Sequence, residues 1–102
     1  MNKTAKTAFT LLLLTTGVMA QADQQTAMMS GCLGCHKADA KLVGPSFQDI
    51  AKKYAGQEGI VDTLANTVKA GSPGGKWGET AMPPSPAPME NIKKVVAWML
   101  TH

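Results

Sequence analysis

The sequence predicts an all-α domain in which helices are joined by long loops. Four segments carry apolar residues at helical spacing, and no segment alternates apolar and polar residues for long enough to form a strand. A stretch rich in glycine and proline, residues 71–87, separates the third predicted helix from the fourth. Unstructured loops of that length are uncommon in so short a chain unless they serve a function.

The first 22 residues are predicted to be a secretory signal peptide. Two lysines precede an apolar run centred on four leucines, and small residues follow up to Ala22. We expect cleavage after Ala22 or else after Ala20. An uncleaved membrane anchor is the alternative, but the apolar stretch over residues 8–20 is interrupted by threonines and is shorter than the ~18–20 residues a spanning helix needs. The order of these segments predicts export to the periplasm and a mature domain over residues 23–102.

Removal of the signal peptide leaves a short chain with nearly balanced charge. The whole sequence has ten basic and seven acidic residues, and two of the lysines lie in the predicted signal peptide, so the positive excess falls from three to one. Such a balance gives no reason to expect nucleic acid or an anionic membrane as a partner. A chain this short also buries little apolar surface, and a cofactor, a metal or a disulfide usually supplies the missing stability.

The four helices are expected over residues 23–30, 46–55, 60–70 and 88–100. In the first, Ala27 and either Met28 or Met29 are expected to face inward. The last helix has the clearest apolar face, formed by Ile92, Val95, Val96, Met99 and Leu100.

Residues 32–36 read Cys-Leu-Gly-Cys-His, the C-x-x-C-H pattern of covalent haem attachment. On a tight helical turn, residues three apart face the same side, so the thiols of Cys32 and Cys35 can both add to haem vinyl groups. His36 is then placed to bind the iron. A redox dithiol and a zinc site are alternatives, but no strand precedes Cys32, as a thioredoxin-like motif requires, and zinc lacks a clear fourth ligand. Export also favours haem, because c-type haem is attached outside the cytoplasm.

A haem iron bound by one histidine has a sixth coordination position. The candidates are Met28, Met29, Met82, Met89, Met99 and His102. Met28 and Met29 lie too close to the attachment turn, Met99 fits the core, and His102 is terminal and expected to be solvated. We therefore predict Met82 as the ligand, because its proline-rich loop can hold an extended backbone against the second haem face, and Met89 remains the substitute.

Two further residues are predicted to support the cofactor. The carbonyl of Pro45 can accept a hydrogen bond from the second ring nitrogen of His36 and so fix the orientation of that ring; an ordinary turn is the alternative. Trp77 can donate its indole N–H to a haem propionate, or it can fill the core.

With these residues in view, the chain resembles the short class I bacterial monohaem cytochromes c of the c-551 type. The likeness runs over nearly all of residues 23–102 and includes Val43-Gly44-Pro45, Lys69-x-Gly71-Ser72, Trp77-Gly78 and Met82-Pro83-Pro84. The resemblance implies the cytochrome c fold, with about four helices wrapped around one covalent haem c, and His36 and Met82 as iron ligands. The chain also departs from its relatives: Thr67 stands where they often have an arginine that reaches a propionate, and Ser85 replaces an asparagine that helps to orient the methionine sulfur. The loop over residues 71–77 is one residue longer, and the first helix lacks the aromatic residue expected near Ala27.

The sequence therefore predicts a periplasmic one-electron carrier that is not an enzyme, because two axial ligands leave no open position at the iron. The resemblance implies redox proteins as partners, with a membrane quinol-oxidising complex as donor and a nitrite reductase or terminal oxidase as acceptor. We expect a monomer without stable membrane insertion. A haem enzyme or gas sensor with an open sixth site, and a subunit of a larger oxidoreductase, remain the alternatives.

Overall fold

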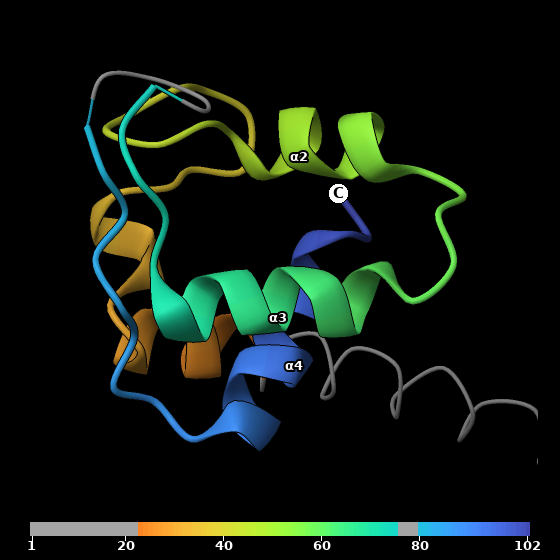
Figure 1. Cartoon of the computed structure of the whole chain (residues 1–102). Helices are drawn as coiled ribbons and strands as arrows, with labels where there is room; N and C mark the ends of the chain where they lie inside the picture. The colour runs from red at the N-terminus through yellow and green to blue at the C-terminus, as the bar shows by residue number, and fades with distance from the viewer. Residues whose placement is uncertain (1–22, 76–79) are drawn as a thin grey trace, which may run out of the picture.

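The chain folds into helices joined by long loops, which confirms the predicted all-α class. The computed structural model describes residues 23–75 and 80–102. In chain order the described elements are a helix over residues 23–29, a 3-10 turn η1 (Cys32–Gly34), and the helices α2 (Phe47–Tyr54), α3 (Ile60–Ala70) and α4 (Met89–Met99). Figure 1 shows α2 above α3, with α4 crossing behind α3 and ending below α2. The predicted signal peptide lies outside the described residues.

Helix α2 begins at a capped end and buries one face. The side chain of Ser46 accepts a hydrogen bond from the backbone N–H of Asp49 over 3.0 Å and so satisfies one of the free donors of the first turn. The buried side is formed by Phe47, Ile50 and Ala51. This spacing of three and four residues is the apolar stripe from which the helix was predicted.

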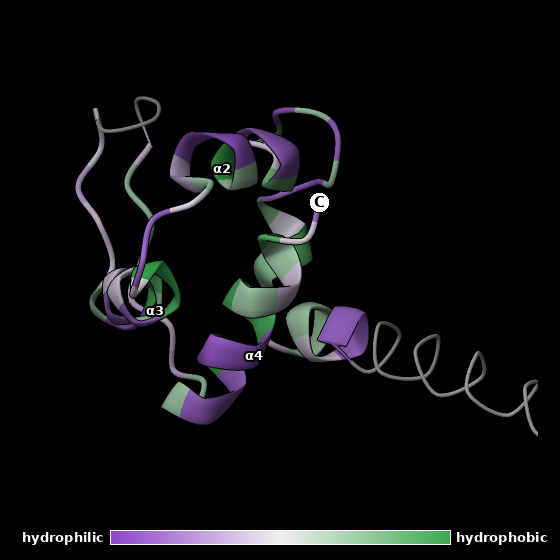
Figure 2. Ribbon diagram, turned by 90° about the vertical axis from the view of Figure 1, so that its right-hand side faces the viewer, coloured by the Kyte–Doolittle hydropathy of each residue, from purple (hydrophilic) through white to green (hydrophobic). Residues whose placement is uncertain are grey.

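Helix α4 packs against both α3 and α2 and is the central element of the core. The six buried residues that form the core cluster come from all three helices: Phe47, Ile50, Ala65, Ile92, Val96 and Met99. Figure 2 shows that each of these helices carries hydrophobic positions beside hydrophilic ones, as expected for helices with one face in a core and one in water.

The helix over residues 23–29 faces the core with fewer residues than predicted. Ala27 is fully buried, in agreement with the prediction, whereas Met28 is 60% exposed and Met29 is 81% exposed. The expectation that one of the two methionines faces inward is therefore wrong. The residues next to Ala27 in sequence turn away from the core, since successive helical positions are about 100° apart.

The glycine- and proline-rich loop doubles back along itself. Ser72 and Met82 form an isolated antiparallel bridge, in which each backbone N–H donates to the carbonyl of the other, over 2.9 and 3.0 Å. Figure 1 shows the segment after residue 80 running down beside the segment that leaves α3. Among residues 23–75 and 80–102, no helix is both long and apolar enough to cross a bilayer.

Candidate functional site

The two cysteines lie on one tight turn. Gly31 precedes the turn with φ at 78°, a left-handed conformation that glycine adopts without strain. The backbone N–H groups of Cys35 and His36 both donate to the carbonyl of Cys32, over 3.2 and 3.0 Å. Because a 3-10 turn has three residues per turn, Cys32 and Cys35 face the same side, as the motif predicts. Burial raises the pKa of the Cys32 thiol, whereas Cys35 is exposed.

The imidazole of His36 is held from two sides. Its Nδ1 lies 2.8 Å from the carbonyl oxygen of Pro45, and since a carbonyl only accepts, Nδ1 carries the proton. The ring of Phe47 stacks against it, with centroids 5.8 Å apart and planes inclined by 21°. Nε2 is then the ring nitrogen whose lone pair is free to bind a metal.

Gly44 is required for this close packing. A Cβ atom at position 44 would lie 2.5 Å from Cε1 and 2.9 Å from Nδ1 of His36, closer than real Cβ contacts occur. The backbone at Gly44 therefore lies directly against the imidazole. Sequence reasoning recognised the Gly44-Pro45 pair but missed this steric role, which depends on the path of the loop around the ring.

The two thiols, the imidazole and Met82 all line one cavity of about 300 Å³. Its remaining lining is mostly apolar and comes from α2, α3, α4 and the loops beside them, with Phe47, Ile50, Leu64, Val68, Ile92, Val95 and Met99 among it. An apolar cavity with a few well-placed polar or ligating groups is the usual form of a cofactor site. The residues present fit a haem group, since the two attachment thiols and candidate axial ligands of nitrogen and sulfur converge on one apolar space.

The methionine candidates for the sixth coordination position differ in whether they line the cavity. Of the described methionines only Met82 and Met99 line the cavity. Met99 is buried in the core cluster on α4, whereas Met89 packs against that cluster from outside the cavity. Met28 and Met29 are exposed and lie outside the lining.

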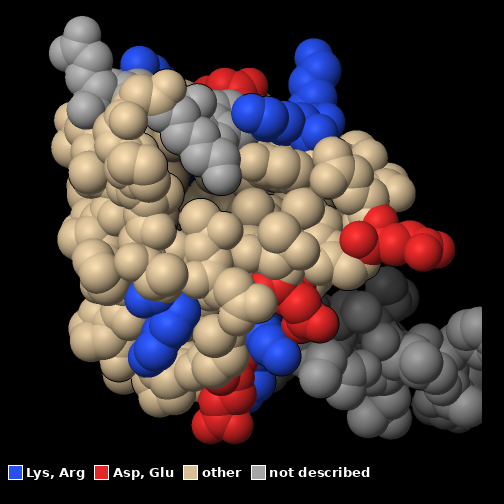
Figure 3. All heavy atoms as spheres, in the orientation of Figure 1, with Lys and Arg blue, Asp and Glu red and all other residues tan. Residues whose placement is uncertain are grey.

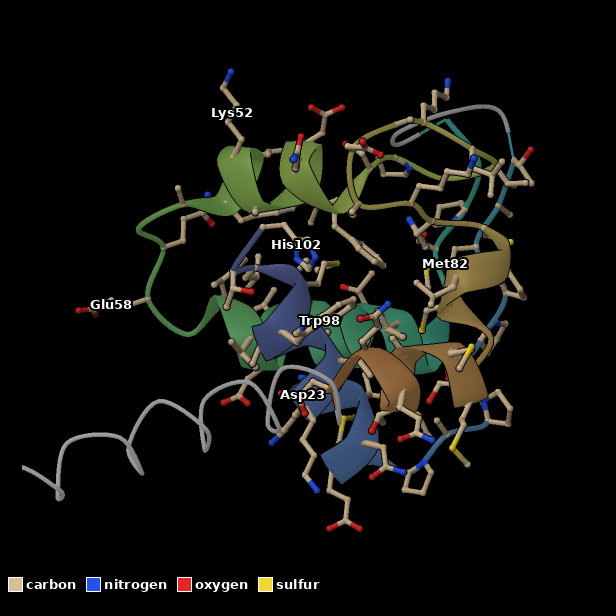
Figure 4. All side chains as sticks on the ribbon, turned by 180° about the vertical axis from the view of Figure 1, so that it is seen from behind. Asp23, Lys52, Glu58, Met82, Trp98 and His102 are labelled. Atoms are coloured by element: carbon tan, nitrogen blue, oxygen red, sulfur yellow. The ribbon has the colours of Figure 1, made fainter. Side chains whose placement is uncertain are left out.

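His102 is exposed, as expected, and its ring also contacts the last turn of α4. Its Nδ1 lies 3.0 Å from the carbonyl oxygen of Met99 and 3.2 Å from that of Trp98, in the last turn of α4. The ring packs edge-on against the indole of Trp98, with centroids 4.6 Å apart. Figure 4 shows these two side chains together at the end of α4, apart from Met82 on its loop. His102 therefore caps the last helix and does not line the cavity.

Three other positions noted in the sequence have different outcomes. Trp77 lies outside the described residues, so its predicted contact with a propionate stays a prediction. Thr67 lines the cavity, but its hydroxyl donates to the carbonyl of Thr63 over 3.1 Å. Ser85 accepts a hydrogen bond from the backbone N–H of Ala87 over 3.3 Å, which stiffens the proline-rich loop.

A family model, curated sequences and solved structures all match this chain to cytochromes c. The family model described as Cytochrome c matches residues 21–102. Cytochrome c-551 of Azotobacter vinelandii is 53% identical over 72 residues, which cover 71% of this chain and 87% of that protein. Cytochrome c-551 of Allochromatium vinosum is 42% identical over 94 residues, which cover 91% of this chain and 97% of that protein. The crystal structure of wild-type cytochrome c552 from Nitrosomonas europaea superposes with a TM-score of 0.72 at 37% identity, covering 76% of this chain and 96% of that one.

Proposed function

Since this chain belongs to the cytochrome c family, as a class I monohaem member of the c-551/c-552 type, we propose that it carries single electrons in the periplasm with His36 and Met82 as the iron ligands. It is an electron carrier rather than an enzyme, like its c-551 relatives, and its cofactor is one covalent haem c. One observation carries the choice of ligands: Cys32, Cys35, His36 and Met82 line the same cavity.

Cys32 and Cys35 are the proposed attachment points, each through a thioether formed from its thiol. When bound, the haem iron supplies the one-electron chemistry by alternating between its ferric and ferrous states. The tight turn holds both sulfur atoms on one side of the chain, and His36 follows directly, so attachment also brings the imidazole to the site. A ligand tethered in this way is not lost when the protein fluctuates.

The residues around His36 determine which ring nitrogen faces the metal. The carbonyl of Pro45 accepts a hydrogen bond from Nδ1–H, and this leaves the lone pair of Nε2 to bind the iron. Gly44 and Phe47 restrict rotation of the ring from two sides. We propose that this enclosure keeps the imidazole in one orientation in both oxidation states, which limits the reorganisation that electron transfer requires.

Met82 is the proposed sixth ligand. Met99 also lines the cavity, but it belongs to the buried core on a continuous helix, and its withdrawal would leave a void among Phe47 and Ile50. Met82 instead lies on a loop, half-buried, where ligation costs no core packing. A thioether ligand raises the potential of a haem iron relative to ligands that favour the ferric state.

Substitution of Met82 tests the ligand set. We expect Met82→Ala to abolish the weak long-wavelength absorption band of thioether-bound ferric haem, to lower the potential and to admit carbon monoxide to the reduced protein. Met89→Leu is the matched control and should keep the band. Loss of the band in Met89→Leu, with Met82→Ala unchanged, would show that the sulfur was wrongly chosen. Carbon monoxide binding to the unsubstituted protein would favour the alternative of an open-site haem enzyme or sensor.

We further propose that residues 1–22 direct export and are removed, and that residues 23–102 act as a periplasmic monomer. The resemblance to c-551 proteins supports a membrane quinol-oxidising complex as electron donor and a nitrite reductase or terminal oxidase as acceptor. The mass of the purified haem protein tests the cleavage, because a mature chain beginning at Asp23, or at Gln21, differs from the full chain by the whole signal peptide.

A further inference from the structure

The segment that carries Met82 has almost no hydrogen-bond donors of its own. Residues 82–88 contain four prolines, so only Met82, Ser85 and Ala87 have a backbone N–H. All three are used: Met82 donates to the carbonyl of Ser72 over 3.0 Å, Ser85 to that of Val68 over 3.1 Å, and Ala87 to the hydroxyl of Ser85 over 3.3 Å. Any further link must be accepted by oxygen atoms of the segment from donors outside it, as the carbonyl of Met82 accepts from the backbone N–H of Ser72.

Lys69 provides such a link. It lies in the last turn of α3, next to Val68, and its Nζ donates to the carbonyl oxygen of Ala87 over 2.8 Å. Val68 and Lys69 thus hold two points of the segment from adjacent positions on one helix. A lysine is favourable at this end of a helix, where the backbone carbonyls carry partial negative charge.

We propose that Lys69 is a positioning residue that latches the Met82 segment to the end of α3 and so keeps the Met82 sulfur in the cavity. The inference rests on the proposed function, because it takes Met82 as the sixth ligand. Opening of the segment competes with iron ligation, so any contact made only in the closed state lowers the fraction of molecules open to an external ligand.

The surroundings of Gly71 show how closely the Met82 segment packs against the backbone that follows α3. A Cβ atom at this position would lie 2.8 Å from the carbonyl oxygen of Met82 and 2.9 Å from the nitrogen of Pro84, and Gly71 has φ at +81°. The loop therefore rests on the backbone that follows α3 with no space between them. Lys69 reaches the segment at Ala87, five residues beyond Met82, so the bridge at Ser72 and the latch hold it at its two ends.

Imidazole binding to the ferric holoprotein tests the latch. Lys69→Met keeps most of the aliphatic stem and removes the donor, and we expect imidazole to bind about threefold to fivefold more tightly, the effect of losing one partly exposed hydrogen bond. The long-wavelength band should also disappear at a lower temperature. Lys69→Arg keeps a charged donor, so its imidazole affinity should return most of the way to that of the unsubstituted protein. Lys93→Met is the matched control: Lys93 is a similarly exposed lysine whose ion pair with Asp62, over 3.2 Å, does not involve the loop.

Each outcome bears on the proposal separately from the ligand assignment. Equal imidazole affinity in Lys69→Met and Lys93→Met would overturn the latch, even if both variants were less stable to heat. A Met82→Ala protein with an unaltered spectrum would instead overturn Met82 as the ligand. Tighter imidazole binding in Lys69→Met alone, with partial reversal in Lys69→Arg, is the result that the latch requires.

Discussion

The position of a single imidazole depends here on backbone atoms of its neighbours. Pro45 fixes the proton on Nδ1 of His36, and the bare Cα of Gly44 lies against the ring. The hydrogen bond to Pro45 could be anticipated from the sequence, because Gly44-Pro45 closely follows the attachment motif and a carbonyl there can reach the second ring nitrogen of His36. The role of Gly44 could not, since a steric limit appears only when the loop path is known.

Gly44→Ala should displace the imidazole of His36. The new methyl group would lie 2.5 Å from Cε1, so either the ring or the loop must move, at a cost of about 1–3 kcal/mol in the free energy of unfolding. We expect a lower midpoint of thermal unfolding and altered shifts of the haem methyl groups in NMR spectra of the ferric protein. Gly34→Ala is the control, because nothing lies within 4 Å of a Cβ at that position. Similar losses in both variants would contradict the steric role of Gly44.

At the scale of elements, the bounds of the helices could be predicted from the sequence, whereas the contacts made by the loops could not. Helix α3 has the bounds that were predicted, and α2 and α4 differ by one residue at each end. Apolar spacing identifies such helices because their burial depends on a local period. The bridge between Ser72 and Met82 has no comparable pattern in the sequence, because it pairs two segments that have no regular secondary structure. Elimination among the candidate ligands and the prolines around Met82, rather than any period, pointed to Met82 and its loop.

Ser46→Ala should weaken α2 and, through it, the packing on His36. The hydroxyl of Ser46, a residue 3% exposed, caps the helix whose first residue, Phe47, stacks against the imidazole. Loss of such a cap costs about 0.5–2 kcal/mol, measured as a lower free energy of unfolding in denaturant. Thr63→Ala removes an exposed hydroxyl that donates to Gly59 and should cost less. A Ser46→Ala protein as stable as the unsubstituted one would show that water replaces the cap.

Once the predicted signal peptide is removed, the molecule has a positive excess of only one charge, arranged around an uncharged core. Figure 3 shows lysines and acidic residues scattered around a face that is otherwise uncharged. Val43, Pro83 and Pro84 are exposed and also line the cavity, so apolar groups surround its opening. Contacts between electron-transfer partners are small and short-lived, and such an apolar rim suits them.

Electron transfer to the physiological acceptor should depend only modestly on salt. Because positive and negative groups nearly cancel, long-range steering is weak, and we expect less than about a tenfold fall in rate between low salt and ~0.15 M, where charges are screened beyond ~8 Å. Stopped-flow measurement of the second-order rate constant checks this. A decline of several orders of magnitude would instead assign docking to the lysines.

The scarcity of N–H groups around Met82 also affects how the protein exchanges hydrogen with solvent. Over residues 82–88 only three amide protons can be replaced by deuterium, and each is engaged in a hydrogen bond. None can exchange until its own bond breaks, and two of those bonds join the segment to the chain around the end of α3. Deuterium uptake at these three amides therefore reports how often the loop opens, and the measurement needs no chemical modification of the protein.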